Sequence, residues 1–427
     1  MNDASFVFSP ANAISIIFAV ALLSGLILKF WLASRQIRHV AHHRHTVPQQ
    51  FAAQISLESH QKAADYTVTQ TRFGMLEMAW NAAITCAWTL LGGLQALNQW
   101  LLSLVGPGMA QQLGLLLGFA IISSAIDLPF SLYKTFVIEQ RFGFNKTSFA
   151  LWLQDALKGA LVGAILGLPL AALVLWMMGA TGTFWWLWTW GVWTAFNLLM
   201  LLVYPVWIAP LFNQFKPLDA PELQDRVNAL MARCGFRAKG FFVMDGSKRS
   251  AHANAYFTGL GSAKRVVFFD TLLEQLNPAE VDAVLAHELG HFKHRHVLKR
   301  MLSMFGMSLA GFALLGWLSA QAWFYQGLGV SPAAYGPNDA LALLLFLMFV
   351  PLLTSFVSPV FSQLSRRHEF EADAYAAAQT SGEDLKHALL KLYKDNASTL
   401  TPDPLYVKFY YSHPPAFERL ARLQVAA

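Results

Sequence analysis

The stretch His287-Glu288-Leu289-Gly290-His291 carries two histidines four residues apart, with a glutamate directly after the first. In an α-helix this spacing corresponds to about 400° of rotation, so the two imidazoles lie only about 40° apart on one face. Such a pair can bind a single Zn²⁺. Glu288 points about a quarter turn away, where its carboxylate can take a proton from a water molecule beside the metal. The pattern is typical of zinc peptidases.

The residues before this stretch predict the helix that it needs. Asn277-Pro278-Ala279-Glu280 combines an N-cap residue, proline at the first helical position and glutamate at the third. An apolar stripe of Val281, Val284 and Leu285 follows, so His287 should lie in the third turn of a partly buried helix. A five-residue motif also arises by chance, and an isolated helical histidine is more often packed or solvated than a ligand. The helix start and the apolar stripe favour metal binding.

The position of a third ligand distinguishes classes of zinc peptidase. Metzincins have glycine three residues and histidine six residues after the second histidine, whereas this chain has His294 and Val297 there. His294 shares the face of His287 but lies about 10 Å further along the axis, an awkward reach for one tetrahedral ion. We therefore expect His294 to be a surface residue at the membrane edge.

A better candidate lies downstream, in the segment 365–373. Glu369 and Asp373 are four residues apart, so a ligating carboxylate and a carboxylate that orients a histidine ligand could share one helical face. Glu371 points elsewhere and is expected to be solvated. Taken alone, an acidic helix is usually only a solvated surface, so this assignment depends on the membrane organisation of the chain.

That organisation follows from composition, because 55% of the residues are hydrophobic, only 13% are charged and the mean hydropathy is +0.40. We predict an α-helical polytopic membrane protein with about seven transmembrane helices and a small α+β zinc-peptidase domain on its cytoplasmic side. Three charges within the spans, Asp127, Asp155 and Lys158, should face the interior. The predicted spans are roughly 11–33, 76–105, 112–136, 149–178, 183–209, 300–324 and 338–363.

Loop charges predict the orientation. The connections 106–111, 179–182 and 325–337 contain no lysine or arginine, whereas basic residues follow the first and third spans. The positive-inside rule therefore places the N-terminus outside and the C-terminus in the cytoplasm. Contact of the basic flanks with anionic lipid explains the net charge of +6, and there is no aromatic-basic platform that would support binding to nucleic acid.

This topology brings His291, just before the sixth span, close to Glu369, just after the seventh, at the cytoplasmic boundary of the bilayer. The predicted parts are residues 1–212 with five transmembrane helices, 213–299 with the peptidase unit, 300–364 with two further helices, and 365–427 with the third zinc ligand. Within 213–299 we predict a helix at 221–231 and strands at 240–245, 252–257 and 264–270. An edge strand there could hold a peptide by strand addition.

The whole chain resembles the CAAX prenyl protease 1 family, the Ste24-type membrane zinc metallopeptidases. The resemblance covers nearly the whole chain. Besides the histidine motif and the segment around Glu369, the stretches that carry it are 128–131, 135–139, 142–147, 210–213 with Phe215, 254–259, 264–273 and 412–415. It implies a large water-filled chamber within the membrane, surrounded by seven helices.

The resemblance also implies roles for individual residues. By this resemblance, His287, His291 and Glu369 bind one zinc ion per chain, and Glu288 is the general base. Asp373 orients a ligand, and His413 lies near the substrate carbonyl. Asn254 and Ala255 lie on the substrate-binding strand.

The function that follows is hydrolysis of peptide bonds by zinc-activated water, with Glu288 moving the proton and His413 as a candidate donor to the oxyanion. Substrates would be peptides or membrane proteins at the cytoplasmic face, with C-terminally lipidated substrates among them. Two alternatives remain open: a broad quality-control peptidase like the HtpX relatives, and a non-enzymatic transporter or scaffold. The ending at 424–427 lacks an ER-retrieval signal, which favours a bacterial inner membrane.

Overall fold

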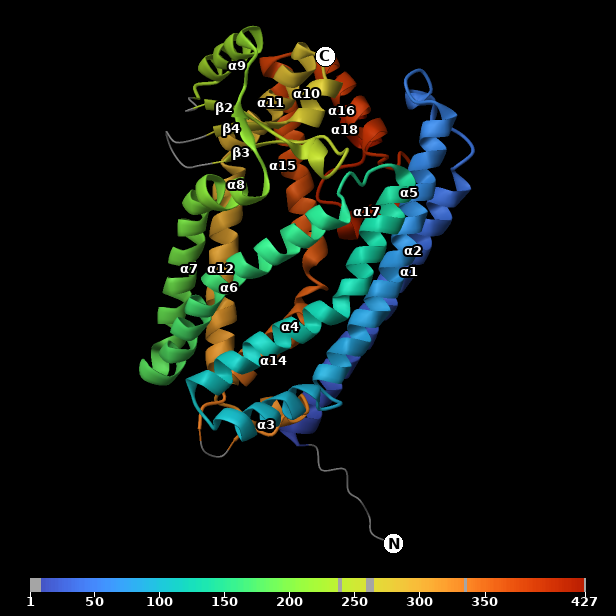
Figure 1. Ribbon diagram of the computed structural model, residues 1–427. Coiled ribbons are helices and arrows are strands. Elements are labelled where there is room, and N and C mark those ends of the chain that lie inside the picture. Colours follow the sequence, from blue (N-terminus) through green and yellow to red (C-terminus); the bar gives the residue numbers. More distant parts are fainter. Residues whose placement is uncertain (1–8, 237–239, 259–264, 334–335, 426–427) are drawn as a thin grey trace.

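The computed structural model describes residues 9–236, 240–258, 265–333 and 336–425, and it is predominantly helical (Figure 1). The helices of the first half are α1 (Pro10–His42), α2 (Leu57–Trp88), α3 (Gly93–Val105), α4 (Met109–Tyr133), α5 (Gln140–Phe142), α6 (Phe149–Ala180), α7 (Trp185–Val203), α8 (Ala209–Phe212) and α9 (Pro221–Arg233). The second half contains α10 (Asp270–Gln275), α11 (Pro278–Lys293), α12 (His296–Leu318), α13 (Ala322–Gly327), α14 (Asp339–Thr354), α15 (Ser358–Gln379), α16 (Gly382–Asp395), α17 (Pro404–Tyr410) and α18 (Ala416–Val425).

Figure 1 shows long helices below and a compact unit of strands and short helices at one end. Helices α1 and α2 lie side by side along one edge, and α7 packs against α12 on the opposite edge. Helix α3 lies at the end of the molecule away from the strands. The C-terminal helices α16 and α18 join the strands at the other end, so residues far apart in sequence form one unit there.

Among the described residues, five helical stretches are long and apolar enough to cross a membrane: Pro10–His42, Met109–Phe142, Phe149–Ala180, Gly182–Phe212 and His296–Leu318. The pair α14 and α15 adds a sixth span if it is counted as one, although it bends by 67° at the break between the two helices. The described residues therefore contain five or six candidate membrane spans.

The prediction of seven spans is therefore not supported, and two of the predicted segments explain the difference. Segment 76–105 is not one helix, because α2 ends at Trp88 and α3 begins at Gly93. Helix α2 also begins earlier than predicted and carries charged residues such as Lys62 and Arg72, so it falls short of the apolarity of the other spans. Segment 338–363 contains Pro351, which removes a backbone hydrogen-bond donor near the bend.

The four strands form one sheet in the order β1-β2-β4-β3, with β1 (Phe215–Pro217), β2 (Gly240–Met244), β3 (Ala255–Thr258) and β4 (Arg265–Phe269). Strands β2 and β4 are parallel, and the other two pairs are antiparallel. The predicted strands at 240–245 and 264–270 are confirmed over most of their length, although Lys264 lies outside the described residues. The predicted strand at 252–257 begins only at Ala255, so half of it is confirmed. Strand β1 was not predicted, because three residues are too short to show a period. Strand β3 is at one edge of the sheet.

Helix α11 begins as predicted. The side chain of Asn277 accepts hydrogen bonds from the backbone nitrogens of Ala279 and Glu280, and the Glu280 carboxylate accepts one from the nitrogen of Asn277. The buried side of α11 packs into a core shared with the sheet and α16, which includes Val281, Leu285, Leu289, Val266, Phe268, Ala388 and Leu389. This packing fixes which face of α11 turns towards α15.

An ion pair connects the membrane helices to this unit. The guanidinium of Arg249 donates to both carboxylate oxygens of Asp155 at 2.8 and 3.0 Å, and it also donates to the side chain of Asn213. Asp155 therefore pairs, whereas Lys158 on the same helix donates to the backbone carbonyl of Leu211. Asp127 lies exposed on α4.

Candidate metal centre

Helices α11 and α15 come unusually close together at Gly290. A Cβ atom at this position would lie 2.9 Å from the Cα of Ala372 and 3.1 Å from its carbonyl oxygen. Both are backbone atoms, which cannot move aside as a side chain can. Glycine therefore permits an approach that brings the carboxylates of α15 next to the histidines of α11.

Three side chains converge at this approach, two from α11 and one from α15. The Nε2 atoms of His287 and His291 are 3.3 Å apart, and each is 3.4 Å from a carboxylate oxygen of Glu369. Two ligand atoms that each lie 2.0–2.1 Å from one tetrahedral zinc ion are separated by about 3.3–3.4 Å. The separation of the two Nε2 atoms therefore matches an edge of a zinc coordination tetrahedron, and the carboxylate of Glu369 faces both nitrogens, with Oε2 towards His287 and Oε1 towards His291.

The hydrogen bonding of Glu369 fits a cation as well. Its Oε2 is buried and accepts no hydrogen bond among the described residues. A buried carboxylate oxygen without a donor is costly, and a metal ion in front of the two histidine nitrogens would remove that cost. The donor set of two imidazoles and one carboxylate is one that zinc prefers, with a fourth position left for water or substrate.

The side chain of His287 is held from behind by a buried ion pair. Its Nδ1 lies 2.8 Å from Oδ1 of Asp373, and Nε of Arg419 on α18 donates to the other oxygen of the same carboxylate at 2.8 Å. All three residues are buried. A proton held on Nδ1 leaves Nε2 free to face the other ligands.

Without a metal, the two histidines have very different proton affinities. Burial lowers the pKa of His287, but the neighbouring carboxylates of Asp373 and Glu369 favour its protonated form, outweigh this effect and raise the pKa to about 9. Burial, followed by repulsion from His287, lowers the pKa of His291 to about 4. Burial also raises the pKa of Glu288 above the usual range for a carboxyl group. A carboxylate with a raised pKa is a stronger base, as a proton acceptor requires.

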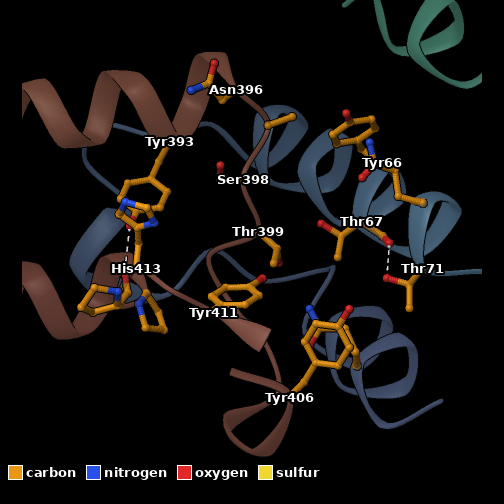
Figure 2. Close-up of a pocket in the computed structure, with 15 residues that line it drawn as sticks. Tyr66, Thr67, Thr71, Tyr393, Asn396, Ser398, Thr399, Tyr406, Tyr411 and His413 are labelled. Atoms are coloured by element: carbon orange, nitrogen blue, oxygen red, sulfur yellow. Dashed lines mark hydrogen bonds between the residues drawn. The ribbon is translucent and has the colours of Figure 1, made fainter. Parts of the chain in front are cut away.

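His413 reaches this cluster from the loop between α17 and α18. Its Nε2 lies 3.5 Å from Oε1 of Glu369, and its Nδ1 is 3.0 Å from the hydroxyl oxygen of Ser412. Its side chain is 66% exposed, and it lines a cavity of about 400 Å³ (Figure 2). In Figure 2, His413 lies beside Tyr393, whose hydroxyl donates to the carbonyl of Pro414 at 3.1 Å.

Asn254 and Ala255 lie at the start of the edge strand β3. The carbonyl of Asn254 accepts from the backbone nitrogen of Phe269 on β4, and its side chain accepts from the nitrogen of Ala255. Strand β3 contacts α11, where the ring of Phe257 packs edge-on against Phe292. No hydrogen bond joins Asn254 or Ala255 to the histidine cluster in the described part of the chain.

Comparison with known proteins identifies the family. Residues 36–214 match the family model described as CAAX prenyl protease N-terminal, five membrane helices, and residues 217–427 match the model for peptidase family M48. The chain is 32% identical to CAAX prenyl protease 1 of Saccharomyces cerevisiae over 95% of its length and 93% of that protein. This chain belongs to the CAAX prenyl protease 1 family.

Two further proteins are similar to this CAAX prenyl protease 1 family member over nearly its whole length. The human CAAX prenyl protease 1 homolog is 31% identical over 96% of this chain and 95% of its own length. The crystal structure of S. mikatae Ste24p superimposes with a TM-score of 0.90 and 30% identity, covering 96% of this chain and 99% of that one. The chain is therefore an integral membrane metallopeptidase. These relatives are eukaryotic and lend no support to the expected bacterial origin.

Two residues of the candidate metal centre were missed by sequence reasoning. Arg419 donates to Asp373 from another helix, 46 residues further along the chain, and no helical spacing relates the two residues. His296 contacts His291 from the first residue of α12, beyond a helix break that was not predicted. Glu371 was expected to be solvated, and its side chain is 47% exposed, but it also pairs with His296. The only sequence signal that could have identified His296 is its position shortly after the motif.

Proposed function

We propose that this family member is a zinc-dependent endopeptidase, with His287, His291 and Glu369 as the protein ligands of one zinc ion. The observation that carries the proposal is the convergence of these three side chains: the two Nε2 atoms are 3.3 Å apart, and each lies 3.4 Å from one of the two carboxylate oxygens of Glu369. Zinc bound there would lower the pKa of a water molecule and polarise the scissile carbonyl.

Residues of this chain would carry the proton transfers. Glu288 accepts the proton of the attacking water as the new C–O bond forms, which places negative charge on the carbonyl oxygen. It then delivers this proton to the leaving amine nitrogen, and the peptide C–N bond breaks as the carbonyl group re-forms. The raised pKa of Glu288 suits both steps, since the same group must first take and then give up a proton. Asp373 keeps His287 in one orientation throughout.

His413 is the proposed donor to the carbonyl oxygen. Its Nε2 lies at the edge of the ligand cluster and is exposed, so a substrate can reach it. A hydrogen bond to an oxygen whose negative charge grows along the reaction stabilises the transition state more than the bound substrate. The prolines that follow, Pro414 and Pro415, restrict the loop that presents this ring.

We propose that the substrate binds as an extra strand along the free edge of β3, beginning at Asn254 and Ala255. The support is the position of β3 at the end of the sheet and its contact with α11. The cavity beside His413 would take substrate residues on one side of the scissile bond (Figure 2). Tyrosines, serine, threonines and amides line it, and none of its described lining residues is an aspartate, glutamate, lysine or arginine. It should therefore accept uncharged side chains, because a charge would lose its water without gaining a partner.

The proposed substrates are membrane-associated peptides and proteins, including C-terminally lipidated ones, and the lipid bilayer is the other partner. The similarity to proteins named CAAX prenyl protease 1 supports this class. The loop charges support an N-terminus outside and a catalytic unit in the cytoplasm. Figure 1 supports the same arrangement, because α1 starts at the end of the molecule opposite the sheet.

The test is a cleavage assay with the purified full-length protein in liposomes. A farnesylated C-terminal peptide is compared with the same peptide without the lipid and with an unfolded membrane protein. We expect cleavage of the lipidated peptide, loss of cleavage on chelation and recovery with zinc. Replacing Glu369 by alanine should remove both zinc and cleavage, and full zinc content in that variant would overturn the ligand assignment. Preference for the unfolded protein would instead indicate a quality-control peptidase.

A further inference from the structure

We propose that Glu371 and His296 form a hydrogen-bonded chain that positions His291, the second histidine of the proposed metal centre. His291 Nδ1 lies 3.0 Å from Nδ1 of His296, and Nε2 of His296 lies 2.8 Å from a carboxylate oxygen of Glu371. The inference rests on the proposed ligand set. It gives a role to two residues that the reaction described above does not use.

The direction of each hydrogen bond in the chain follows from the ligand role of His291. If Nε2 of His291 faces the metal, its proton is on Nδ1, and this N–H donates to Nδ1 of His296. His296 must then carry its own proton on Nε2, which donates to Glu371. A proton on both nitrogens of His296 would set two N–H groups against each other across 3.0 Å. Only this arrangement has one hydrogen in each link, so the chain fixes both tautomers.

The surroundings hold the ring of His296 in this geometry. The residue is buried, with 4% of its surface exposed. The ring of His368 lies parallel against it, with centroids 3.9 Å apart. The residue before it, Arg295, has φ 55° and ψ 34°, a left-handed conformation that non-glycine residues seldom adopt. That turn separates α11 from α12 and directs the first side chain of α12 back towards α11.

The two histidine ligands are therefore supported in different ways. His287 contacts a buried carboxylate directly, and that carboxylate is neutralised by Arg419. On its Nδ1 side, His291 reaches a carboxylate through a second imidazole, and that carboxylate, of Glu371, is half-exposed. The partners that orient a metal ligand influence how tightly the metal is held, typically by about 10–100-fold in affinity or activity. Loss of the His296 chain should therefore act mainly on metal retention.

The experiment measures the rate at which a chelator removes zinc from the purified full-length protein. His296→Phe keeps an aromatic ring in the buried position but has no acceptor for His291, and zinc release should become about 10–100-fold faster. His296→Asn keeps an oxygen near the place of Nδ1 and should restore part of the retention. Glu371→Gln changes a half-exposed carboxylate without altering its size, so it tests the chain without endangering the fold; release should be several times faster.

The matched control is His294→Phe, which replaces a histidine of the same cluster whose ring faces His296 at a centroid distance of 5.5 Å. Its zinc release should equal that of the unmodified protein. Equal release rates for His296→Phe and His294→Phe, with unchanged thermal unfolding, would overturn the proposal. His291→Ala separates the two proposals. If that variant loses zinc while His296→Phe releases it normally, only the chain is wrong. If His291→Ala keeps its zinc, the ligand set itself fails.

Discussion

Replacing Gly290 by alanine tests whether the contact between α11 and α15 sets the geometry of the proposed metal centre. The new Cβ would lie 2.9 Å from Cα of Ala372, whereas ordinary van der Waals contact begins at 3.4 Å. The helices must therefore separate by 0.5 Å, the difference between these two distances. Such a shift would move the carboxylate of Glu369 away from the nitrogens of His287 and His291, which now lie 3.4 Å away.

The size of this shift gives the expected effect. Zinc–ligand distances tolerate changes of only about 0.2 Å, so zinc should bind at least about tenfold more weakly. Overpacking of the helix contact should also destabilise the metal-free protein by about 1–3 kcal/mol. Chelator competition measures the first quantity, and thermal unfolding of the chelated protein measures the second.

Gly74→Ala is the matched control for this substitution. Gly74 lies inside α2, and a Cβ there would meet no atom within 4 Å. Alanine has the higher helix propensity, so Gly74→Ala should be neutral or stabilise the protein by up to about 1 kcal/mol. Gly290→Ala with normal zinc affinity and normal thermal unfolding would refute the argument that the close helix contact shapes the site.

Three further predictions concern the chemistry of the site. Glu288→Gln should keep its zinc, measured by elemental analysis, but lose turnover by at least about 10²-fold; residual activity near normal would exclude Glu288 as the base. His413→Ala should lower kcat by about 10²–10³-fold with little change in KM and zinc content, as measured by steady-state kinetics, and near-normal kcat would assign this residue a structural role. Zinc binding should depend on pH, because below pH 9 the metal-free His287 carries a proton that zinc must displace. Affinity should therefore rise about tenfold per pH unit and level off near pH 9. Asp373→Asn lacks one of the two carboxylates that raise this pKa, so chelator competition should show the plateau at lower pH, and an unchanged plateau would contradict the assignment.

Several elements could be predicted from the sequence because their signals are local. The helix start at Asn277 depends on residues within one turn, and the capping hydrogen bonds are those that the residue types predict. The apolar stripe after it identifies the buried face of α11. The spacing of His287 and His291 places them on one face of that helix, and their ring nitrogens are 3.3 Å apart.

Other features depended on contacts between segments that are distant in sequence. The 67° bend after α14 and the break between α2 and α3 changed the count of spans, because hydropathy measures length and apolarity but not where a helix ends. The approach of α11 to α15 is possible only because a glycine meets the backbone of Ala372, and no local pattern reports which residue a glycine will face.

The contacts that support the proposed metal centre also join segments that are distant in sequence. Arg419 reaches Asp373 through the packing of α18 against α15, and His296 reaches His291 through a left-handed residue between two helices. The sequence alone determined which side chains can bind a metal, since chemistry and helical spacing are local properties. Only the tertiary structure decided which partners hold those side chains, because hydrogen bonds between distant helices depend on how the buried faces pack.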